Sequence, residues 1–322
     1  MDGNKLYILM YHYTRDLIHS RYPGIKGLDI AMFRKQLDFF QANFNVVRME
    51  QVIEAVKGRD TLPDKALLLT FDDGYIDNYT YALPLLLEYG FQASFFIPGK
   101  TFSTHQLLDV NKIHYILASA DPGRIVTDLR DRMEHYRGSE YDYPSFDELW
   151  EKYAVNGKYD GSDTVFIKRM LQTVLPEMLR NRISSELFGK YVGISEEKMA
   201  YELYMSKEQI HVLKRSGMFI GVHGYDHYWL GKLKTEHMKE DIIKALDVMD
   251  EFIIRDNWVM NYPYGSYNDD VISFVSKNGA CIGLTTNAGV ADIQSDPVFT
   301  LPRFDCNDFP PKSDVYKKYE CL

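Results

Sequence analysis

Two pairs of residues in this sequence could hold a metal ion and activate a water molecule. Asp72 and Asp73 follow the apolar run ALLLTF, and His223 and His227 lie in GVHGYDHYWL, after the run MFIGV. A short apolar run that ends near a turn glycine predicts a buried strand emerging at a sheet edge. One carboxylate and two imidazoles form a ligand set for zinc or a similar divalent ion, with positions left for water and substrate. The other aspartate would then be free to take a proton from that water as a general base.

Each pair alone also has an ordinary structural interpretation. An Asp pair before a glycine is common in turns and N-caps, and histidines four positions apart often only solvate a helix face. The H-x-x-x-H spacing places both rings on one face of a helical turn, whereas Gly224 equally favours a loop that leads into a helix. Because both pairs stand at strand ends, a functional site is favoured.

Two further segments bring reactive groups to strand ends. In NYPYGSYN, Pro263 and Gly265 fix a turn around Tyr264, whose backbone N–H could point at a developing oxyanion. A Pro-Tyr-Gly turn is also common without any function. His12 ends the run LYILMY, and it is either a neutral core histidine or, opposite a metal-bound water, a general acid for a leaving amine.

Strand and helix patterns alternate in two parts of the chain. The predicted strands LYILMY, ALLLTF and FQASFFI alternate with helices over residues 29–44 and 81–90. After residue 205, the strands MFIGV, WVMNY and CIGLTT alternate with helices over 207–217, 236–253 and 269–279. This alternation predicts parallel βαβ units in a closed or nearly closed α/β barrel, whose site is built at the carboxyl ends of the strands. The candidate residues fall at those ends.

Residues 102–205 interrupt the alternation. They are charged, rich in tyrosine and helical in pattern, with a break expected near Pro176. We interpret 102–205 as a helical insertion, a lid or a homodimer face, between two parts of one catalytic barrel, residues 1–101 and 206–322.

Composition excludes several classes of partner. A formal net charge of −9 argues against a nucleic-acid-binding surface, which would be rich in Lys and Arg. The three cysteines, Cys281, Cys306 and Cys321, have no metal-type spacing, and their odd number fits a reducing compartment. No apolar run approaches about 18 residues, and the first residues lack a signal-peptide core. We therefore expect a cytoplasmic protein without stable membrane insertion.

The motifs together resemble the polysaccharide deacetylase family, carbohydrate esterase family 4. TFDDG resembles its first motif, which implies Asp72 as catalytic base and Asp73 as metal ligand. HGYDH resembles its H-[ST]-x-x-H motif, with a glycine in place of Ser or Thr, which implies His223 and His227 as metal ligands. NYPYG resembles its R-x-P-Y motif and implies Tyr264 at the oxyanion position, although Asn261 replaces the usual arginine that braces the base.

The late L-x-L-H motif of the family, which carries the acid histidine, is absent from the C-terminal segment TLPRFDCNDF. The N-terminal LMYH has the same form moved to the front. Such a circular permutation is typical of the poly-β-1,6-N-acetylglucosamine deacetylase branch, and it implies His12 as general acid. Arg303 is a candidate to replace the missing arginine beside Asp72, and a surface salt bridge is the alternative. The resemblance covers about residues 6–101 and 206–309 and implies a distorted (β/α)7-type parallel barrel.

We therefore expect a metal-dependent N-deacetylase acting on an N-acetylated amino sugar in glycan or surface polysaccharide metabolism. Zinc is the expected metal, with Co, Ni or Mn as alternatives, and Trp229, Pro263 and Gly265 are candidates for contacts with the sugar. One alternative is a deformylase or other amide hydrolase acting on a nucleotide- or lipid-linked sugar. Another is a lapsed enzyme, marked by Asn261, that binds carbohydrate through aromatic residues such as Tyr267.

Overall fold

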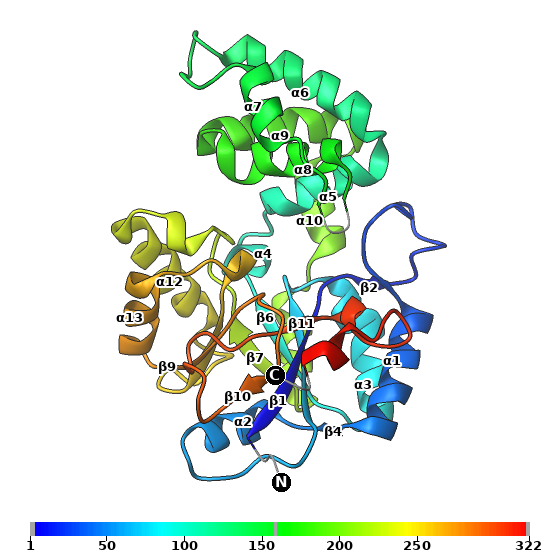
Figure 1. The fold of residues 1–322 in the computed structure, drawn as a ribbon, viewed down its shortest axis with the longest axis vertical. Helices are drawn as coiled ribbons and strands as arrows, with labels where there is room; N and C mark the ends of the chain where they lie inside the picture. Colours follow the sequence, from blue (N-terminus) through cyan, green and yellow to red (C-terminus); the bar gives the residue numbers. More distant parts are fainter. Residues whose placement is uncertain (1–3, 158–159, 320–322) are drawn as a thin grey trace. The chain divides into compact units, whose positions relative to one another are not determined.

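The computed structural model describes residues 4–157 and 160–319, which divide into two compact units (Figure 1). Unit 1 combines Gly27–His105 with the described parts of Met1–Asp16 and Glu202–Leu322. Unit 2 combines Leu17–Lys26 with the described part of Gln106–Tyr201. The segment Leu17–Lys26, which the sequence-based division places in the barrel, thus groups with the helical unit.

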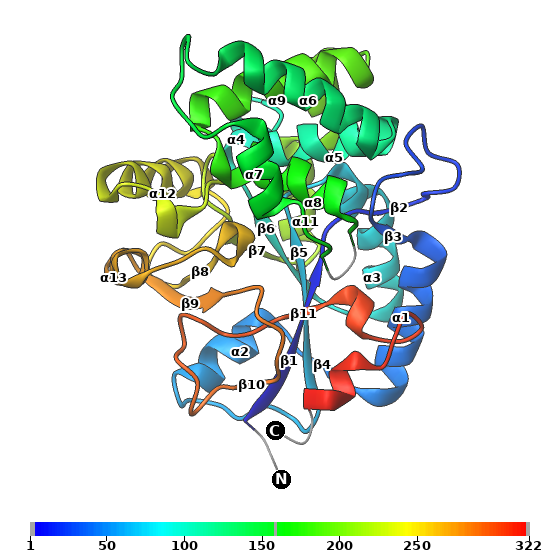
Figure 2. The ribbon, with the colours of Figure 1, turned by 45° about the horizontal axis from the view of Figure 1, so that its top comes forward.

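Unit 1 is built on a mostly parallel sheet with the strand order β10-β1-β5-β6-β7-β8-β9. Its strands are β1 (Lys5–Tyr11), β4 (Asn45–Val46), β5 (Ala66–Asp72), β6 (Ala93–Ile97), β7 (Phe219–Val222), β8 (Trp258–Asn261), β9 (Ala280–Leu284), β10 (Ala291–Asp292) and β11 (Phe304–Asp305). A separate parallel pair is formed by β2 (Thr14–Arg15) and β3 (Leu28–Asp29). Figure 2 shows β1, β5, β6 and β7 running side by side.

The two edges of this sheet are joined by the chain that follows residue 300. Leu301 bridges Leu284 of β9, and Phe304 of β11 pairs in parallel with Leu9 of β1. The sheet therefore curves into a distorted barrel, and the predicted fold class is confirmed. The strands of this barrel are buried along nearly their whole length, as expected for parallel strands covered on both faces.

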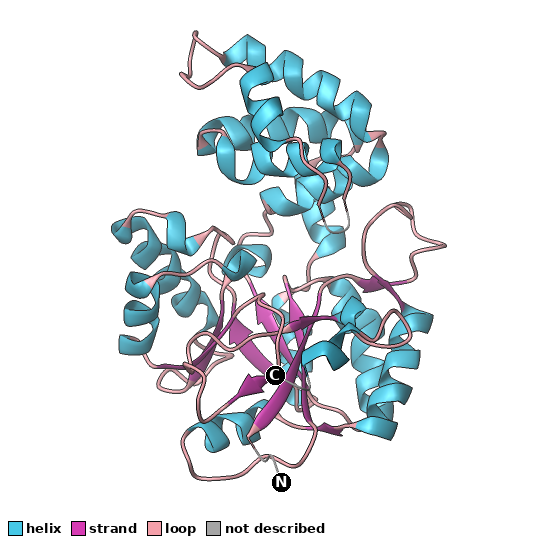
Figure 3. Cartoon of the chain, viewed as in Figure 1, coloured by secondary structure: helices cyan, strands magenta, loops and turns pink. Residues whose placement is uncertain are grey.

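Helices surround the strands of unit 1 (Figure 3). They are α1 (Ile30–Asn43), α2 (Met49–Val56), α3 (Leu83–Tyr89), α4 (Gly99–Ser103), α11 (Lys207–Arg215), α12 (Thr235–Met249) and α13 (Asp269–Lys277). The predicted alternation of strands and helices is confirmed. Several predicted elements are longer than the observed ones. For example, β6 begins at Ala93 and not at residue 91, β9 ends at Leu284 and not at residue 286, and α12 ends at Met249 and not at residue 253. The short elements α2, β10 and β11 were not predicted.

The first long helix shows how sequence fixes local structure. Asp29 caps α1 by accepting a hydrogen bond from the Ala31 N–H at 2.9 Å. Phe33, Leu37 and Phe40 recur at helical spacing and are fully buried, so the predicted apolar face of this helix is confirmed. Figure 1 shows α1 beside α3, with which it is in contact.

Unit 2 consists of helices joined by loops (Figure 3). They are α5 (Asp109–Ser119), α6 (Pro122–Tyr136), α7 (Phe146–Tyr153), α8 (Ser162–Arg169), α9 (Glu177–Tyr191) and α10 (Glu196–Leu203), the last of which continues into unit 1. The predicted break near Pro176 is present: Leu175 is extended, as the residue before a proline prefers, and α9 begins directly after Pro176.

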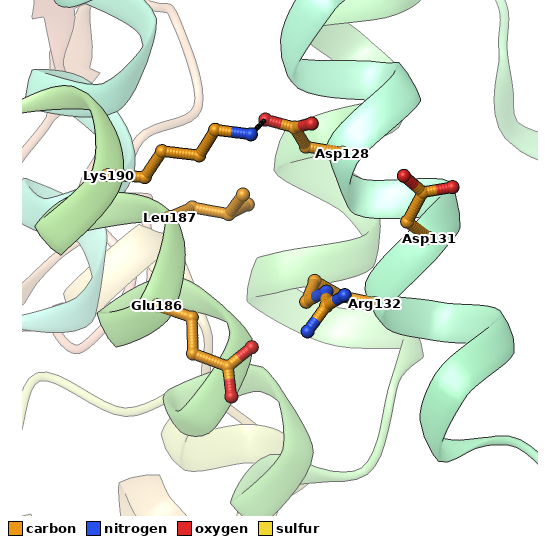
Figure 4. Close-up of a pocket in the computed structure, with 6 residues that line it drawn as sticks. All are labelled: Asp128, Asp131, Arg132, Glu186, Leu187 and Lys190. Atoms are coloured by element: carbon orange, nitrogen blue, oxygen red, sulfur yellow. Dashed lines mark ion pairs between the residues drawn. The ribbon is translucent and has the colours of Figure 1, made fainter.

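A polar hollow of about 270 Å³ lies in unit 2 between α6 and α9 (Figure 4). Its lining includes the ion pair of Asp128 with Lys190, together with Asp131, Arg132 and Glu186. The Lys190 side chain is half-exposed, and ion pairs of this kind contribute little to stability. The charges in this hollow are mixed in sign and form no ligand set for a metal ion.

Two findings concern the expected location of the protein. Within residues 4–157 and 160–319, every helix is too short or too polar to cross a lipid bilayer. Cys281 and Cys306 are free thiols, and Cys321 lies outside the described residues.

Candidate metal centre and active site

Strand ends bring the candidate residues to one place in unit 1. Asp72 is the last residue of β5, His223 follows β7 directly, and His12 follows β1. Asn261 is the last residue of β8, and Arg303 directly precedes β11. Because β1, β5, β7 and β8 all run in the same direction, their carboxyl ends share one edge of the barrel, as in other parallel barrels.

The structure places Asp73, His223 and His227 as one buried cluster. Asp73 Oδ1 lies 3.2 Å from His227 Nε2 and 3.5 Å from His223 Nε2. The candidate ligand atoms of all three side chains lie within 4.8 Å of one another. Asp73 Oδ1 accepts no hydrogen bond from the described residues, although it is buried. A buried carboxylate oxygen facing two imidazole nitrogens fits a bound cation, so these three residues could hold a metal ion.

The charge states in this cluster also favour metal binding. Burial opposes ionisation of Asp73, but its contacts with His223 and His227 hold the pKa of this carboxyl group well below its usual value. Burial lowers the pKa of His227 by more than its contact with Asp73 raises it. An ionised carboxylate and a neutral imidazole are the forms that bind a metal.

The orientation of the His223 ring is set by a backbone carbonyl. His223 Nδ1 lies 2.7 Å from the carbonyl oxygen of Asn261. Because a carbonyl can only accept, Nδ1 carries a proton, and Nε2 is the ring nitrogen that faces Asp73 and could bind a metal ion. Hydrogen bonds of this kind, made by the second ring nitrogen, fix the tautomer of metal-binding histidines.

The two histidines lie on a loop, so of the two alternatives the helical turn is wrong and the loop is confirmed. Residues 223–229 contain no helix, and His227 has a φ of 60°. The buried carboxylate of Asp241, on α12, accepts hydrogen bonds from the N–H groups of Tyr225 at 3.0 Å and Asp226 at 2.8 Å. A Cβ at Gly224 would lie 3.0 Å from Asp241 Oδ2, so the absence of a side chain at position 224 makes room for this carboxylate.

Asp72 has surroundings quite different from those of Asp73. Arg303 donates to both of its oxygens, to Oδ1 at 2.9 Å and to Oδ2 at 2.8 Å, and Asn261 Nδ2 donates to Oδ1 at 2.7 Å. Burial opposes ionisation of Asp72, but Arg303 and His223 outweigh it and lower the pKa of this carboxyl group. Arg303 is 1% exposed, so the alternative of a surface salt bridge does not apply. Asp72 is thus an ionised carboxylate fixed by two neighbours.

His12 lies near Oδ2 of the Asp72 carboxylate, whereas Asn261 contacts Oδ1. Its Nε2 is 3.8 Å from Asp72 Oδ2, too far for a hydrogen bond, and its side chain is 40% exposed. The alternative interpretation of His12 as a buried core histidine is therefore wrong. The exposed ring is accessible to a substrate.

Tyr264 lies next to the histidine cluster. Its ring is 4.6 Å from the His227 ring and stacks on Trp229 at 4.4 Å, with 6° between the planes. Lys232 Nζ lies 4.5 Å from the Trp229 ring centre, so Tyr264 and Lys232 both contact this indole. In this structure Trp229 packs against Tyr264. This packing is an alternative role to the sugar contact expected for Trp229.

The residues flanking Tyr264 have a structural role. Tyr264 has a φ of 58° and Gly265 a φ of 65°, and a Cβ at Gly265 would lie 2.3 Å from Thr286 Oγ1. Pro263 is buried, and Tyr267 packs on Tyr262 with ring centres 5.2 Å apart. The turn therefore requires glycine at position 265 whether or not that residue contacts a substrate.

Three residues near the site had no assigned role from sequence. Asn261 was recognised only as a departure from a motif. Its side-chain amide donates to Asp72, and its backbone carbonyl contacts the His223 ring. Asp241, on α12 and 16 positions after Tyr225, holds the loop that carries His223 and His227. The Tyr75 hydroxyl donates to Asp73 Oδ2 at 2.6 Å. Of these three residues, only Tyr75 could have been suggested by the sequence, because it lies two positions after the candidate ligand Asp73.

Comparison with known proteins agrees with the fold and the motifs. A family model described as Polysaccharide deacetylase matches residues 59–134 and 170–282, more than half of the chain. YxkH of Bacillus subtilis, whose name assigns it to the polysaccharide deacetylases, is 21% identical over 211 residues, which are 65% of this chain and 66% of YxkH. The poly-β-1,6-N-acetyl-D-glucosamine N-deacetylase of Escherichia coli K12 is 39% identical over 64 residues, 20% of this chain and only 10% of that enzyme.

Two solved structures share the fold over nearly the whole chain. The Streptococcus pyogenes deacetylase PplD, solved in complex with acetate, superposes with a TM-score of 0.58 at 17% identity, covering 98% of this chain and 96% of PplD. IcaB from Ammonifex degensii superposes with a TM-score of 0.56 at 19% identity, covering 97% of this chain and 96% of IcaB. At such identities these similarities establish the fold, and the family is established by the family model. This chain belongs to the polysaccharide deacetylase family.

Proposed function

We propose that this protein is a metal-dependent N-deacetylase that removes acetyl groups from an N-acetylated amino sugar of a polysaccharide. The main support for this proposal is that two adjacent carboxylates have different neighbours. Asp73 faces two imidazole nitrogens, whereas Asp72 is held by Arg303 and Asn261. Two neighbouring carboxyl groups in such different surroundings are suited to two different roles.

Asp73, His223 and His227 would hold the metal, and zinc is the ion we propose, with Co, Ni or Mn as alternatives. A bound zinc ion would polarise the amide carbonyl and lower the pKa of water toward neutrality. His223 and His227 have the ring nitrogens required, and the buried Asp73 Oδ1 has the charge.

Asp72 is proposed as the general base. Its lowered pKa keeps it ionised at neutral pH, so it can accept a proton from the attacking water. The fork of Arg303 and the amide of Asn261 fix the carboxylate and prevent it from turning away. Arg303 is itself fixed, because its Nε donates to the carbonyl of Thr285 at 2.8 Å.

His12 is proposed to protonate the departing amine, and the backbone N–H of Tyr264 to stabilise the tetrahedral oxyanion. The partial exposure of His12 supports this assignment, because a general acid must reach the leaving group of a substrate. The left-handed backbone at Tyr264 supports the second assignment, since strained residues of this kind cluster at functional sites.

The substrate is proposed to be a polysaccharide by analogy with relatives whose names record that activity. The deformylase alternative involves the same residues and differs only in the acyl group. The lapsed-enzyme alternative is weaker, because Asn261, the departure that motivated it, donates a hydrogen bond to Asp72. The cytoplasmic location stays a proposal, which cell fractionation can test. The role of unit 2 as lid or homodimer face also stays a proposal, and sedimentation can test the homodimer.

The test combines metal binding with a substrate assay. We expect calorimetry to find one zinc site in chelator-stripped protein, strongly weakened by His227→Ala and unchanged by His237→Ala, which alters an exposed histidine of α12. Metal-loaded protein should then release acetate from N-acetylglucosamine oligomers. Formate release from N-formylated analogues alone would favour the deformylase. Glycan binding without release of either acid would identify a lapsed enzyme, and absence of any metal site would contradict the mechanism.

A further inference from the structure

The two oxygens of the Asp73 carboxylate lie in different surroundings. Oδ2 accepts a hydrogen bond of 2.6 Å from the Tyr75 hydroxyl. Oδ1 faces the Nε2 atoms of His223 and His227 and accepts no hydrogen bond from the described residues. One oxygen is therefore occupied by the protein, while the other is directed into the histidine cluster.

The Tyr75–Asp73 contact is a direct hydrogen bond between two buried side chains. The phenol hydroxyl donates and the Asp73 carboxylate accepts, at 2.6 Å. Tyr75 and Asp73 are both buried, so solvent does not compete for this contact. Short O–H···O hydrogen bonds to a carboxylate are among the strong ones.

The Tyr75 ring is held in place on two sides. It stacks on Tyr13 at 4.0 Å and on Tyr204 at 6.2 Å, with 12° and 11° between the respective planes. The turn that carries it is also fixed, because the Met205 N–H donates to the carbonyl of Gly74 at 3.0 Å and Tyr204 forms a bridge with Tyr75. Tyr75 is fully buried. Its hydroxyl cannot follow the carboxylate if Asp73 rotates.

We propose that Tyr75 is a positioning residue that restricts Asp73 to binding the metal through Oδ1 alone. A carboxylate can bind a cation through one oxygen or two, and the number of donor atoms decides the geometry of a first-row metal site. By holding Oδ2, Tyr75 keeps one coordination position for water or substrate. This inference rests on the proposed metal site.

The test uses Tyr75→Phe with Tyr11→Phe as a matched control. Tyr11 is also fully buried, and its hydroxyl donates to Gln36 Oε1 at 2.9 Å, so both variants lose one buried hydroxyl and one hydrogen bond. We expect Tyr75→Phe to weaken zinc binding about 10–100-fold, as removal of an outer partner of a metal ligand typically does. Tyr11→Phe should bind zinc like the wild type.

The visible spectrum of the Co²⁺-loaded protein provides a readout that a merely structural role would not change. With Oδ2 released, a second oxygen can bind, and the ligand-field bands of Co²⁺ weaken as the number of donors rises. We expect weaker bands in Tyr75→Phe and an unchanged spectrum in Tyr11→Phe. Equal affinity and an identical spectrum in wild type and Tyr75→Phe would overturn the proposal.

A structure of the zinc-loaded wild-type protein tests the same point if Tyr75→Phe fails to fold. We expect only Asp73 Oδ1 within bonding distance of the ion, with Oδ2 still on Tyr75. Two bound oxygens of Asp73 would overturn the inference about Tyr75 and leave the metal site intact. A wild-type protein that binds no metal would instead contradict the proposed function.

Discussion

At the scale of single residues, the site depends on giving two adjacent aspartates different neighbours. Asp72 ends a strand, and Asp73, with a φ of 71°, lies in the left-handed region. Asp73, His227 and Tyr264 are three of the five non-glycine residues with positive φ within residues 4–157 and 160–319. Such a conformation costs about 1–3 kcal/mol each and persists where surrounding contacts enforce it. Strain is thus concentrated at the residues proposed to bind the metal and the oxyanion.

Replacing Asp72 by Asn should separate catalysis from metal binding. The amide keeps the shape of the side chain but cannot accept the proton, so we expect kcat to fall about 10²–10⁴-fold. The ligands Asp73, His223 and His227 remain, so zinc affinity measured by calorimetry should change little. Deacetylation at the wild-type rate would refute the assignment of Asp72 as base.

Replacing Arg303 by Met should destabilise the fold. This change leaves the buried Asp72 charge without its guanidinium partner, and breaking such a pair typically costs about 3–5 kcal/mol. Denaturant unfolding measures the effect. In the double variant with Asp72→Asn, no carboxylate is left unpaired, so we expect a loss smaller than the sum of the two single changes. Additive losses would show that the two side chains are not coupled.

At the scale of elements, both histidines lie in residues 223–229, a loop without helix or strand between β7 and the short 3-10 helix Leu230–Lys232 that precedes α12. Its backbone is held from outside: Gly99 N–H donates to the carbonyl of Gly224 at 3.0 Å, and Lys100 N–H donates to that of Tyr225 at 3.1 Å. Asp241 binds the opposite side of the loop through two N–H groups. The loop is therefore positioned by α4 and α12 together.

Asp241→Asn tests this anchor through the pH dependence of stability. Burial raises the pKa of Asp241 from 3.8 to about 6, although the N–H groups of Tyr225 and Asp226 oppose the shift. Because the folded state then binds more protons than the unfolded state, stability from this group is fully present below about pH 4 and is lost as the pH rises to about 6. This pKa shift corresponds to a change of about 3 kcal/mol in the free energy of unfolding between low and neutral pH.

In the metal-free Asp241→Asn variant, the side chain at position 241 no longer titrates. We therefore expect this variant to lose less stability between pH 4 and pH 7 than the wild type. It should also bind zinc more weakly, because the two N–H groups bind different oxygens of Asp241 and asparagine replaces one of these oxygens by an NH2 group, which cannot accept. Asp247→Asn is the control, since Asp247 is an exposed carboxylate on the same helix that pairs with Arg255 at the surface. Identical pH profiles for Asp241→Asn and wild type would contradict the assigned pKa.

At the scale of the whole molecule, one barrel is interrupted by a helical unit and then completed. Residues after the interruption contribute β7, β8 and β9, which carry the histidines and Asn261. Tyr204 and Met205, at the return to the barrel, bind the turn after Asp73. The chain thus returns to the barrel directly at the proposed metal site.

Deleting unit 2 tests whether it restricts the substrate. The deletion should remove residues 106–201, keep Tyr204 and Met205, and replace Leu17–Lys26 with a short linker, because Tyr22 of that segment packs on Tyr115. We expect zinc affinity to be retained, while the relative rates on short and long N-acetylated oligosaccharides change. Loss of the metal site together with unit 2 would contradict a role as lid.

The sequence by itself determined the main elements and pointed to the candidate metal ligands. Apolar runs, helical spacing and caps act over a few residues, so they predict β1, β5, β7, β8 and α1 without knowledge of the partners. The motifs also singled out Asp73, His223 and His227 as candidate ligands, because each motif is local and follows a strand.

Only the tertiary structure decided how these groups are supported. Arg303 is 231 positions from Asp72, and Asn261 is 189 positions from it, so their contacts depend on closure of the barrel. The same holds for Asp241, whose carboxylate reaches the histidine loop only because α12 packs beside it. Side-chain hydrogen bonds of this kind are short in space and leave no periodic pattern in a sequence. The identity of the reactive residues is therefore local information, whereas their charge state and orientation are decided by the fold.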